Sequence, residues 1–176
     1  NLKNLTTMLS KKLHDAINEQ INAELWSAYL YLSMSMDAEI KGYKGVANWF
    51  YVQFQEEQDH ARIFMNYLNS RDAKVELKMI NVVPTEWDSV LSMFRQTLEH
   101  EKRVTAMIDN IAAIANEDKD FASINRIAWF IDEQVEEEAS FNTLIAKISR
   151  IENDSNAIFM LDSELAQRSF DAAAEA

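Results

Sequence analysis

Several residue types are scarce in this chain of 176 residues: it has no cysteine, two glycines (Gly42 and Gly45) and one proline (Pro84). The lack of cysteine excludes disulfides, thiolate metal ligands and cysteine nucleophiles. So few helix-breaking residues predict a small number of long helices. The length suits one domain, residues 1–176, with a substantial core.

Positive charge and long apolar runs are also scarce. Seventeen lysines and arginines stand against 29 aspartates and glutamates, which gives a net charge of -12 and argues against a nucleic-acid partner. The negative excess favours cationic ligands, or simply solubility. No apolar run approaches the length that spans a membrane, and the first residues lack the apolar block of a signal peptide. We therefore expect a cytoplasmic protein with no membrane partner.

Apolar residues recur every three or four positions along most of the chain, which predicts amphipathic helices. The predicted helices cover residues 7–37, 44–70 and 85–116, then a fourth that follows the polar run 116–120 and ends near 151. A short fifth helix is expected over 157–168, with a frayed tail at 171–176. This fifth helix is too short to be stable alone. Its apolar residues therefore need cover, for which a neighbouring subunit is the natural candidate.

The stretch from 71 to 83 is different, because it lacks helical periodicity and is rich in β-branched residues. Pro84 favours an extended conformation at Val83. An extended segment of this length can cross the whole bundle, so the third helix would start at the same end as the second. Thr85 is predicted to cap that third helix, with Glu86 and Asp88 in its first turn. The predicted fold is all-α: a four-helix bundle over about 7–151 with one long crossover, plus the fifth helix.

Six side chains suited to metal binding recur in a repeating arrangement. Each half of the chain offers one on a first helix and two, three residues apart, on the next helix, and in both halves the first position precedes the second by 33 residues. Residues three apart share a helical face. The six are Glu24, Glu57, His60, Glu101, Gln134 and Glu137.

So many inward carboxylates would repel one another and resist burial unless cations neutralised them. Oxygen and imidazole ligands without sulfur suit iron, manganese or zinc. Carboxylates from several helices can bridge two ions, and two adjacent Fe(II) ions can pass two electrons together to dioxygen. The pattern predicts a metal site inside a helical bundle.

The segments around these positions resemble those of bacterial non-haem ferritins, over nearly the whole chain. The segments are Asn-Glu-Gln-Ile-Asn-Ala-Glu24-Leu, Gln-Glu56-Glu57-Gln-Asp-His60, His-Glu101, Glu133-Gln134-Val-Glu136-Glu137-Glu and Asp162-Ser-Glu-Leu165. The resemblance implies a ferritin-like fold and a hollow shell of 24 subunits. It also implies a ferroxidase that oxidises Fe(II) with dioxygen or hydrogen peroxide and stores Fe(III) as a mineral.

By the same resemblance, Glu24, Glu57 and His60 would hold the first iron. Glu57 would bridge to a second iron, held also by Glu101 and Glu137, with Gln134 beside the pair. The matching residues of a third iron site are Glu56, Glu133 and Glu136.

Two aromatic residues are linked to this chemistry. Tyr31 lies two helical turns after Glu24 and matches a tyrosine near the family's di-iron centre, although plain packing is an equal alternative. Trp129, four residues before Glu133, could supply or relay an electron.

The chain also departs from related di-iron proteins. A second Glu-x-x-His is absent, because Ser140 stands three residues after Glu137. That counts against centres of the bacterioferritin, rubrerythrin and ribonucleotide-reductase types, and no haem is expected. The alternative function is a di-iron oxidase or oxygenase acting on an organic substrate. A purely structural bundle would leave the inward carboxylates unexplained.

Helical spacing also assigns residues outside the site. Tyr29 and Tyr51 are predicted to pack in the core. At 100° per residue, three consecutive glutamates cannot all face inward. We therefore expect Glu137 to face the site and Glu138 to face solvent. The remaining tryptophans are assigned to the core or an interface: Trp26, Trp49 and Trp87.

Overall fold

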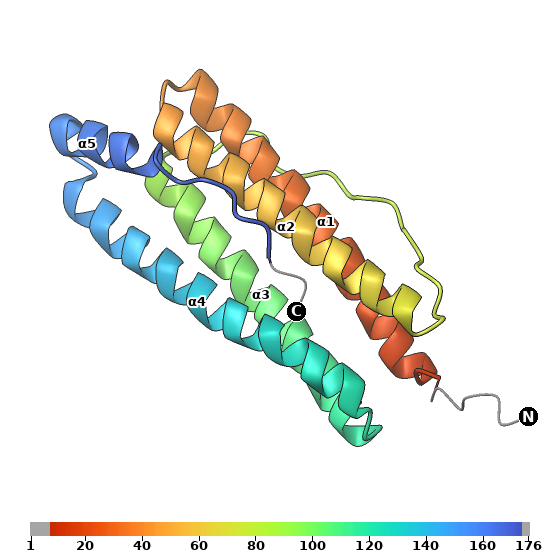
Figure 1. The fold of residues 1–176 in the computed structure, drawn as a ribbon. Helices are drawn as coiled ribbons and strands as arrows, with labels where there is room; N and C mark the ends of the chain where they lie inside the picture. The colour runs from red at the N-terminus through yellow and green to blue at the C-terminus, as the bar shows by residue number, and fades with distance from the viewer. Residues whose placement is uncertain (1–7, 174–176) are drawn as a thin grey trace, which may run out of the picture.

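The computed structural model describes residues 8–173, which form five helices and no strand. The helices are α1 (Lys11–Ile40), α2 (Lys44–Ser70), α3 (Val90–Glu117), α4 (Phe121–Ile151) and α5 (Ser155–Leu165). Figure 1 shows α1 beside α2 and α3 beside α4, with α5 across one end of the bundle. The predicted all-α bundle with a long crossover and a short fifth helix is confirmed. None of the described helices has the length and apolar character needed to cross a membrane.

Several helix boundaries follow from local capping. The side chain of Ser10 accepts the N–H of Leu13 at 3.1 Å and starts α1, and Asp120 accepts the N–H of Ser123 at 3.0 Å to start α4. The bounds of α2 match the prediction. The predicted start of the first helix at residue 7 lies outside the described residues, and α1 begins at Lys11.

The predicted cap at Thr85 is wrong. The helix α3 begins five residues later, where Ser89 and Ser92 exchange side-chain and backbone hydrogen bonds in a capping box. Residues 85–88 are kept out of the helix by a distant contact, since Asp37 of α1 accepts the backbone N–H of Trp87 at 3.1 Å. Trp87 is buried, so this contact fixes the end of the crossover.

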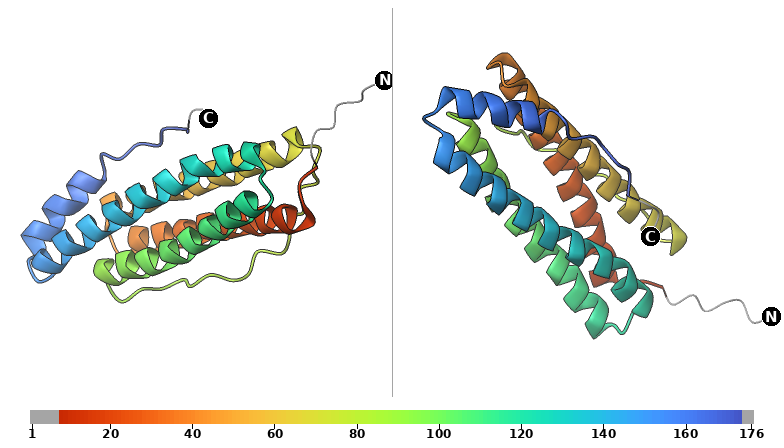
Figure 2. Two further views of the ribbon diagram at one scale, coloured as in Figure 1. Left: turned by 90° about the horizontal axis from the view of Figure 1, so that it is seen from below. Right: turned by 60° about the vertical axis from the view of Figure 1, so that its left-hand side comes forward.

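The crossover runs along the outside of α1, as Figures 1 and 2 show. Two side chains of α1 tie it down: Asn18 accepts the backbone N–H of Glu76, and Asn22 that of Lys78, both at 2.7 Å. Four residues of helix rise about 6 Å. Two extended residues rise about 6.6 Å. Because these two lengths are similar, asparagines four residues apart on α1 can accept hydrogen bonds from residues two apart in the crossover.

The apolar core is divided in two. One cluster lies toward α5 and includes Phe50 and Phe94, and the other lies toward the opposite end and includes Phe64 and Phe130. Each of the four long helices passes from one cluster to the other. At that transition it carries buried polar residues, so a polar layer crosses the middle of the bundle.

The prediction that Tyr29 and Tyr51 pack in the core is wrong, since they are 51% and 45% exposed. Tyr31 is fully buried, and two residues along a helix correspond to about 200° of rotation, so Tyr29 faces away from the core. Tyr51 lies between the buried Phe50 and Val52 and likewise faces outward. Of the three tryptophans assigned to the core or an interface, Trp49 and Trp87 are buried and Trp26 packs against the core cluster nearer α5.

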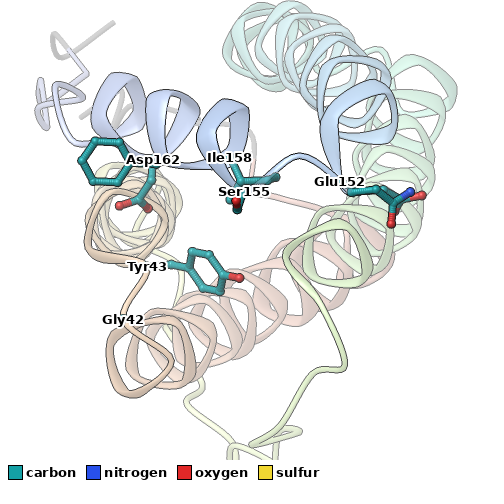
Figure 3. Close-up of a pocket in the computed structure, with 8 residues that line it drawn as sticks. Gly42, Tyr43, Glu152, Ser155, Ile158 and Asp162 are labelled. Atoms are coloured by element: carbon teal, nitrogen blue, oxygen red, sulfur yellow. The ribbon is translucent and has the colours of Figure 1, made fainter.

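The helix α5 docks closely on the start of α2. The Asp162 carboxylate accepts the backbone N–H of Val46 at 2.9 Å, and a Cβ added to Gly45 would lie 1.6 Å from the Asp162 carbonyl oxygen. A cavity of about 400 Å³ lies beside this contact, and Figure 3 shows Tyr43 and Ile158 among its lining residues. This cavity shares no residue with the polar layer.

The chain after α5 turns back along α2 (Figures 1 and 2). The guanidinium of Arg168 lies 4.1 Å from the ring centre of Trp49, and the N–H of Ala173 donates to Asp59 at 2.9 Å. The predicted frayed tail has no regular secondary structure over residues 171–173, although Ala173 is hydrogen-bonded to α2. Residues 174–176 lie outside the described part of the chain.

Candidate metal centre

The polar layer brings the predicted ligands together from four helices. Glu24 comes from α1, Glu57 and His60 from α2, Glu101 from α3, and Gln134 and Glu137 from α4. All six side chains are at most 8% exposed. They are buried because each of the four helices carries residues of one core cluster before this layer and residues of the other cluster after it.

The first group of ligand atoms comes from Glu24, Glu57 and His60, which lie within 4.8 Å of one another. The Nδ1 atom of His60 is 3.5 Å from Oε2 of Glu57 and 4.0 Å from Oε2 of Glu24. Oε2 of Glu24 is buried and has no hydrogen-bond partner among the described residues. An oxygen in that position lacks the compensation that burial requires, and a cation would supply it.

The second group comes from Glu57, Glu101 and Glu137, whose carboxylate oxygens also lie within 4.8 Å of one another. Glu57 belongs to both groups. The two are therefore adjacent, and one carboxylate can serve two cations. Among residues 8–173 these are the only groups of three or more acidic or histidine side chains with this spacing.

Tyr31 and Gln134 both contact Glu101. The hydroxyl of Tyr31 donates to Oε1 of Glu101, and Nε2 of Gln134 lies 3.1 Å from Oε2. Tyr31 therefore has a polar contact with the site as well as packing contacts. Glu101 is held from both sides.

Sequence reasoning missed two other buried amides, Gln20 and Gln53. Nε2 of Gln20 donates to Oε1 of Glu24 at 2.6 Å, and Nε2 of Gln53 donates to Glu57 at 3.0 Å. Each glutamine stands four residues before its glutamate, and the two pairs are 33 residues apart. The repeat that identified the glutamates therefore also contained these residues.

Burial controls the protonation of the carboxyl groups. It raises the pKa of Glu57 to about 8, with a contribution from the charge of Glu101. It also raises the pKa of Glu24 and of Glu137 well above the usual range, assisted by neighbouring carboxylates. Without cations, low polarity and mutual repulsion favour the protonated forms.

The residues present fit a pair of divalent or trivalent cations. Four carboxylates and one imidazole converge, with no thiolate and no buried lysine or arginine among the described residues to neutralise them. Hard oxygen ligands with imidazole match iron, manganese and zinc. The unpartnered oxygen of Glu24 and the shared Glu57 indicate two adjacent positions.

The residues assigned to a third iron site are not gathered in the same way. Glu56 and Glu133 line a cavity of about 230 Å³ on the outer side of His60, which the segment 170–173 partly closes. Glu56 forms an ion pair with Arg168 at 2.5 Å, and Glu136 is exposed to solvent. No three-ligand group forms among these glutamates in the described structure.

The other assignments near the site have mixed outcomes. The ring of Trp129 lies edge-on to that of His60, 5.6 Å between centres, so it is next to the first group of ligand atoms.

Glu138, predicted to face solvent, is half-buried and accepts a hydrogen bond from the hydroxyl of Thr105 at 2.7 Å. Its position on α4 points it toward α3 instead of outward.

Comparison with known proteins gives one consistent result. A family profile described as "Ferritin: Ferritin-like domain" matches residues 14–151. A bacterial non-heme ferritin from Staphylococcus aureus is 41% identical over 164 residues, covering 93% of this chain and 99% of the relative. A bacterial non-heme ferritin from Staphylococcus saprophyticus is 42% identical, with 93% and 98% covered.

Solved structures agree with the sequence relatives. The open pore ferritin from the hyperthermophilic archaeon Archaeoglobus fulgidus superposes with a TM-score of 0.90 at 43% identity, covering 92% of this chain and 99% of that one. A humanized archaeal ferritin gives a TM-score of 0.91 at 42% identity, with 93% and 99% covered.

Proposed function

The chain belongs to the ferritin family, and from this premise we propose that it stores iron in a hollow shell of identical subunits. Fe(II) is oxidised at the paired carboxylate site by dioxygen or hydrogen peroxide, and Fe(III) collects inside as a mineral. The observation that carries the proposal is the pair of adjacent buried ligand groups sharing Glu57. The Staphylococcus relatives are bacterial non-heme ferritins, which supports the same reading.

In this proposal, Glu24, Glu57 and His60 bind one Fe(II), and Glu57, Glu101 and Glu137 bind the other. Gln134 lies beside the second position and holds Glu101. The hard carboxylate oxygens favour Fe(III) over Fe(II), so they lower the potential of the bound iron. Two Fe(II) ions together supply the two electrons that convert dioxygen and two protons to hydrogen peroxide, so no one-electron product is released.

The protein positions the carboxylate and imidazole ligands and controls their protonation. The four helices hold the ligands in place before iron arrives, and the two apolar clusters limit the access of water. Glu57, whose pKa is raised to about 8, gives up its proton when a cation replaces it. Tyr31 donates to Glu101 and so restricts the rotation of that carboxylate.

Exposed apolar side chains support assembly into a shell. Phe159 and Met160 of α5 are 71% and 72% exposed, and Met79 and Val82 of the crossover are 84% and 91% exposed. Such side chains on two outer surfaces indicate contacts with other copies. We propose 24 subunits, as in the family that the chain belongs to.

A third iron near Glu56, Glu133 and Glu136 also remains a proposal. Glu56 would have to release Arg168 before it could bind a cation. The edge-on contact between Trp129 and His60 supports an electron-relay role for Trp129.

The test is the rate of Fe(II) oxidation in a Glu57→Ala variant. Loss of this residue removes a ligand from both positions, so rapid oxidation should fall by more than about a hundredfold, since outer-shell changes alone cost about 10–100-fold. The shell should still assemble, because the variant removes a buried acidic group and none of the exposed apolar contacts. Gln58→Ala, an exposed change one residue away, is the matched control and should oxidise at the parent rate. Unchanged oxidation in Glu57→Ala would reject the site.

A further inference from the structure

Two buried glutamines beside the carboxylates have no role in the function proposed above. Gln20 is fully buried and Gln53 is 1% exposed. Each lies one turn before a glutamate of the site, Gln20 before Glu24 and Gln53 before Glu57, so each shares a helical face with that glutamate. Burying an amide costs free energy unless its polar groups form hydrogen bonds, so the contacts that these two amides form need an explanation.

Gln53 connects two helices. Its Nε2 atom lies 3.0 Å from Oε1 of Glu57 on α2, and 2.9 and 3.1 Å from the two oxygens of Glu137 on α4. An amide has two N–H donors, so one group can serve both carboxylates. Because the amide is uncharged, it can hold the carboxylates without acting as a resident cation that would compete with metal.

Gln20 has a single partner. Its Nε2 atom donates to Oε1 of Glu24 at 2.6 Å, and its own Oε1 atom has no partner among the described residues. Gln20 and Gln53 therefore act alike in one respect, because each binds Oε1 of the glutamate one turn later. The other oxygen, Oε2, is left toward His60, at 4.0 Å in Glu24 and 3.5 Å in Glu57.

We propose that Gln20 and Gln53 are positioning residues that pre-set the carboxylates for different metal positions. Gln20 orients Glu24 for the first position, which His60 also lines. Gln53 orients Glu57, which lines both positions, and both oxygens of Glu137, which lines only the second, so it acts mainly on the second position, which Glu101 also lines. Holding these side chains in one rotamer removes an ordering cost that metal binding would otherwise meet. This inference rests on the proposed function, because it assumes two metal positions per chain.

The experiment measures Zn²⁺ binding, which needs no redox chemistry, in three assembled Gln→Leu variants at positions 20, 53 and 58. Gln58 is exposed and adjacent to Glu57, so Gln58→Leu is the matched control. Calorimetric titration gives the two affinities per chain. Crystals grown at limiting Zn²⁺ give the occupancy of each position from the anomalous signal of zinc.

We expect Gln53→Leu to weaken binding at the second position by about tenfold or more, the size typical of outer-shell changes. Gln20→Leu should instead weaken the first position, and Gln58→Leu should match the parent. Gln53→Asn, which keeps the amide but is one methylene shorter, should repeat the loss at the second position. It also provides the test if the leucine variant fails to assemble.

Two results would overturn the inference. Parent-like affinities in Gln20→Leu and Gln53→Leu would show that the amides position nothing. Equal weakening of both positions in each variant, together with a lower melting temperature without metal, would show a general structural role. If the parent itself binds fewer than two Zn²⁺ per chain, the metal site of the proposed function has failed instead.

Discussion

In the proposed metal site, Glu57 exchanges a proton for a cation. Its pKa is raised from 4.5 to about 8, with burial as the main cause, so the metal-free group is mostly protonated at neutral pH. A group with a raised pKa stabilises the folded protein below its ordinary pKa, and this contribution is lost as the pH rises through about 8. Metal binding requires the deprotonated form.

Zn²⁺ binding should therefore release fewer protons as the pH rises. Between about pH 6.5 and 9.5, the release per chain should fall by about one proton, because Glu57 has already ionised at the higher pH. Calorimetry in buffers of different ionisation enthalpy measures this number. The Glu57→Ala variant should lack the step near pH 8, whereas constant or rising release in the parent would contradict the account.

At the level of residues, the sequence could predict which polar side chains gather inside the bundle but not all of their hydrogen-bond and ion-pair partners. Spacing alone identified six inward side chains, because helical geometry is regular and buried carboxylates are chemically unusual. The ion pair between Arg168 and Glu56 could not be predicted, since it joins residues 112 positions apart. Tyr29 was misassigned because both it and Tyr31 lie at plausible core spacings, and only one side of the helix faces inward.

Among the helices, the contact between α5 and α2 depends on Gly45. A methyl group at that position would lie 1.6 Å from the Asp162 carbonyl oxygen, so Gly45→Ala must displace α5 or the start of α2. We expect a stability loss of about 1–3 kcal/mol or more. Amide hydrogen exchange over 155–165 should become faster, as measured by mass spectrometry.

Gly42→Ala is the matched control. Gly42 has open space around it but a φ of +86°, so alanine there should cost about 1–2 kcal/mol through backbone strain alone. Exchange in α5 should then stay at the parent rate. Unchanged exchange in Gly45→Ala would mean that the close contact does not hold α5.

The crossover should loosen when its anchors are removed. Asn18→Ala removes the acceptor for the N–H of Glu76 and a donor to the carbonyl of Lys74. Together these losses should lower the free energy that holds the crossover on α1 by about 1–2 kcal/mol. Trypsin should then cut faster after Lys74 and Lys78. Glu19→Ala removes only an exposed ion pair with Lys78 and should leave the cutting rate near that of the parent. Equal rates in Asn18→Ala and the parent would show that the anchor is dispensable.

The sequence predicted helix ends correctly where neighbouring residues set the boundary. The prediction failed where a contact with a distant residue sets it. The bounds of α2 and the end of α4 agree with the sequence pattern. The start of α3 does not, because the contact between Asp37 and Trp87 keeps residues 85–88 out of the helix. Thr85 resembles a cap in sequence, but a contact spanning 50 residues cannot be read from its neighbours.

For the whole molecule, the two apolar clusters and the polar layer between them explain how one chain can carry buried carboxylates. The clusters stabilise the bundle on both sides, so the site need not contribute to stability. The exposed apolar side chains of α5 and the crossover leave surfaces for other copies to cover. The proposed storage in a shell needs both the buried carboxylates and the exposed apolar surfaces.

The central claim is storage, and the most direct test is iron retained by the protein. Aerobic Fe(II) is added in large excess over chains, and iron co-eluting with protein is measured on a sizing column. We expect a very large particle, far above the 20.3 kDa of one chain, that retains many more irons than its binding positions can hold. Retention that stops near two irons per chain on a small species would contradict storage and favour a di-iron oxidase.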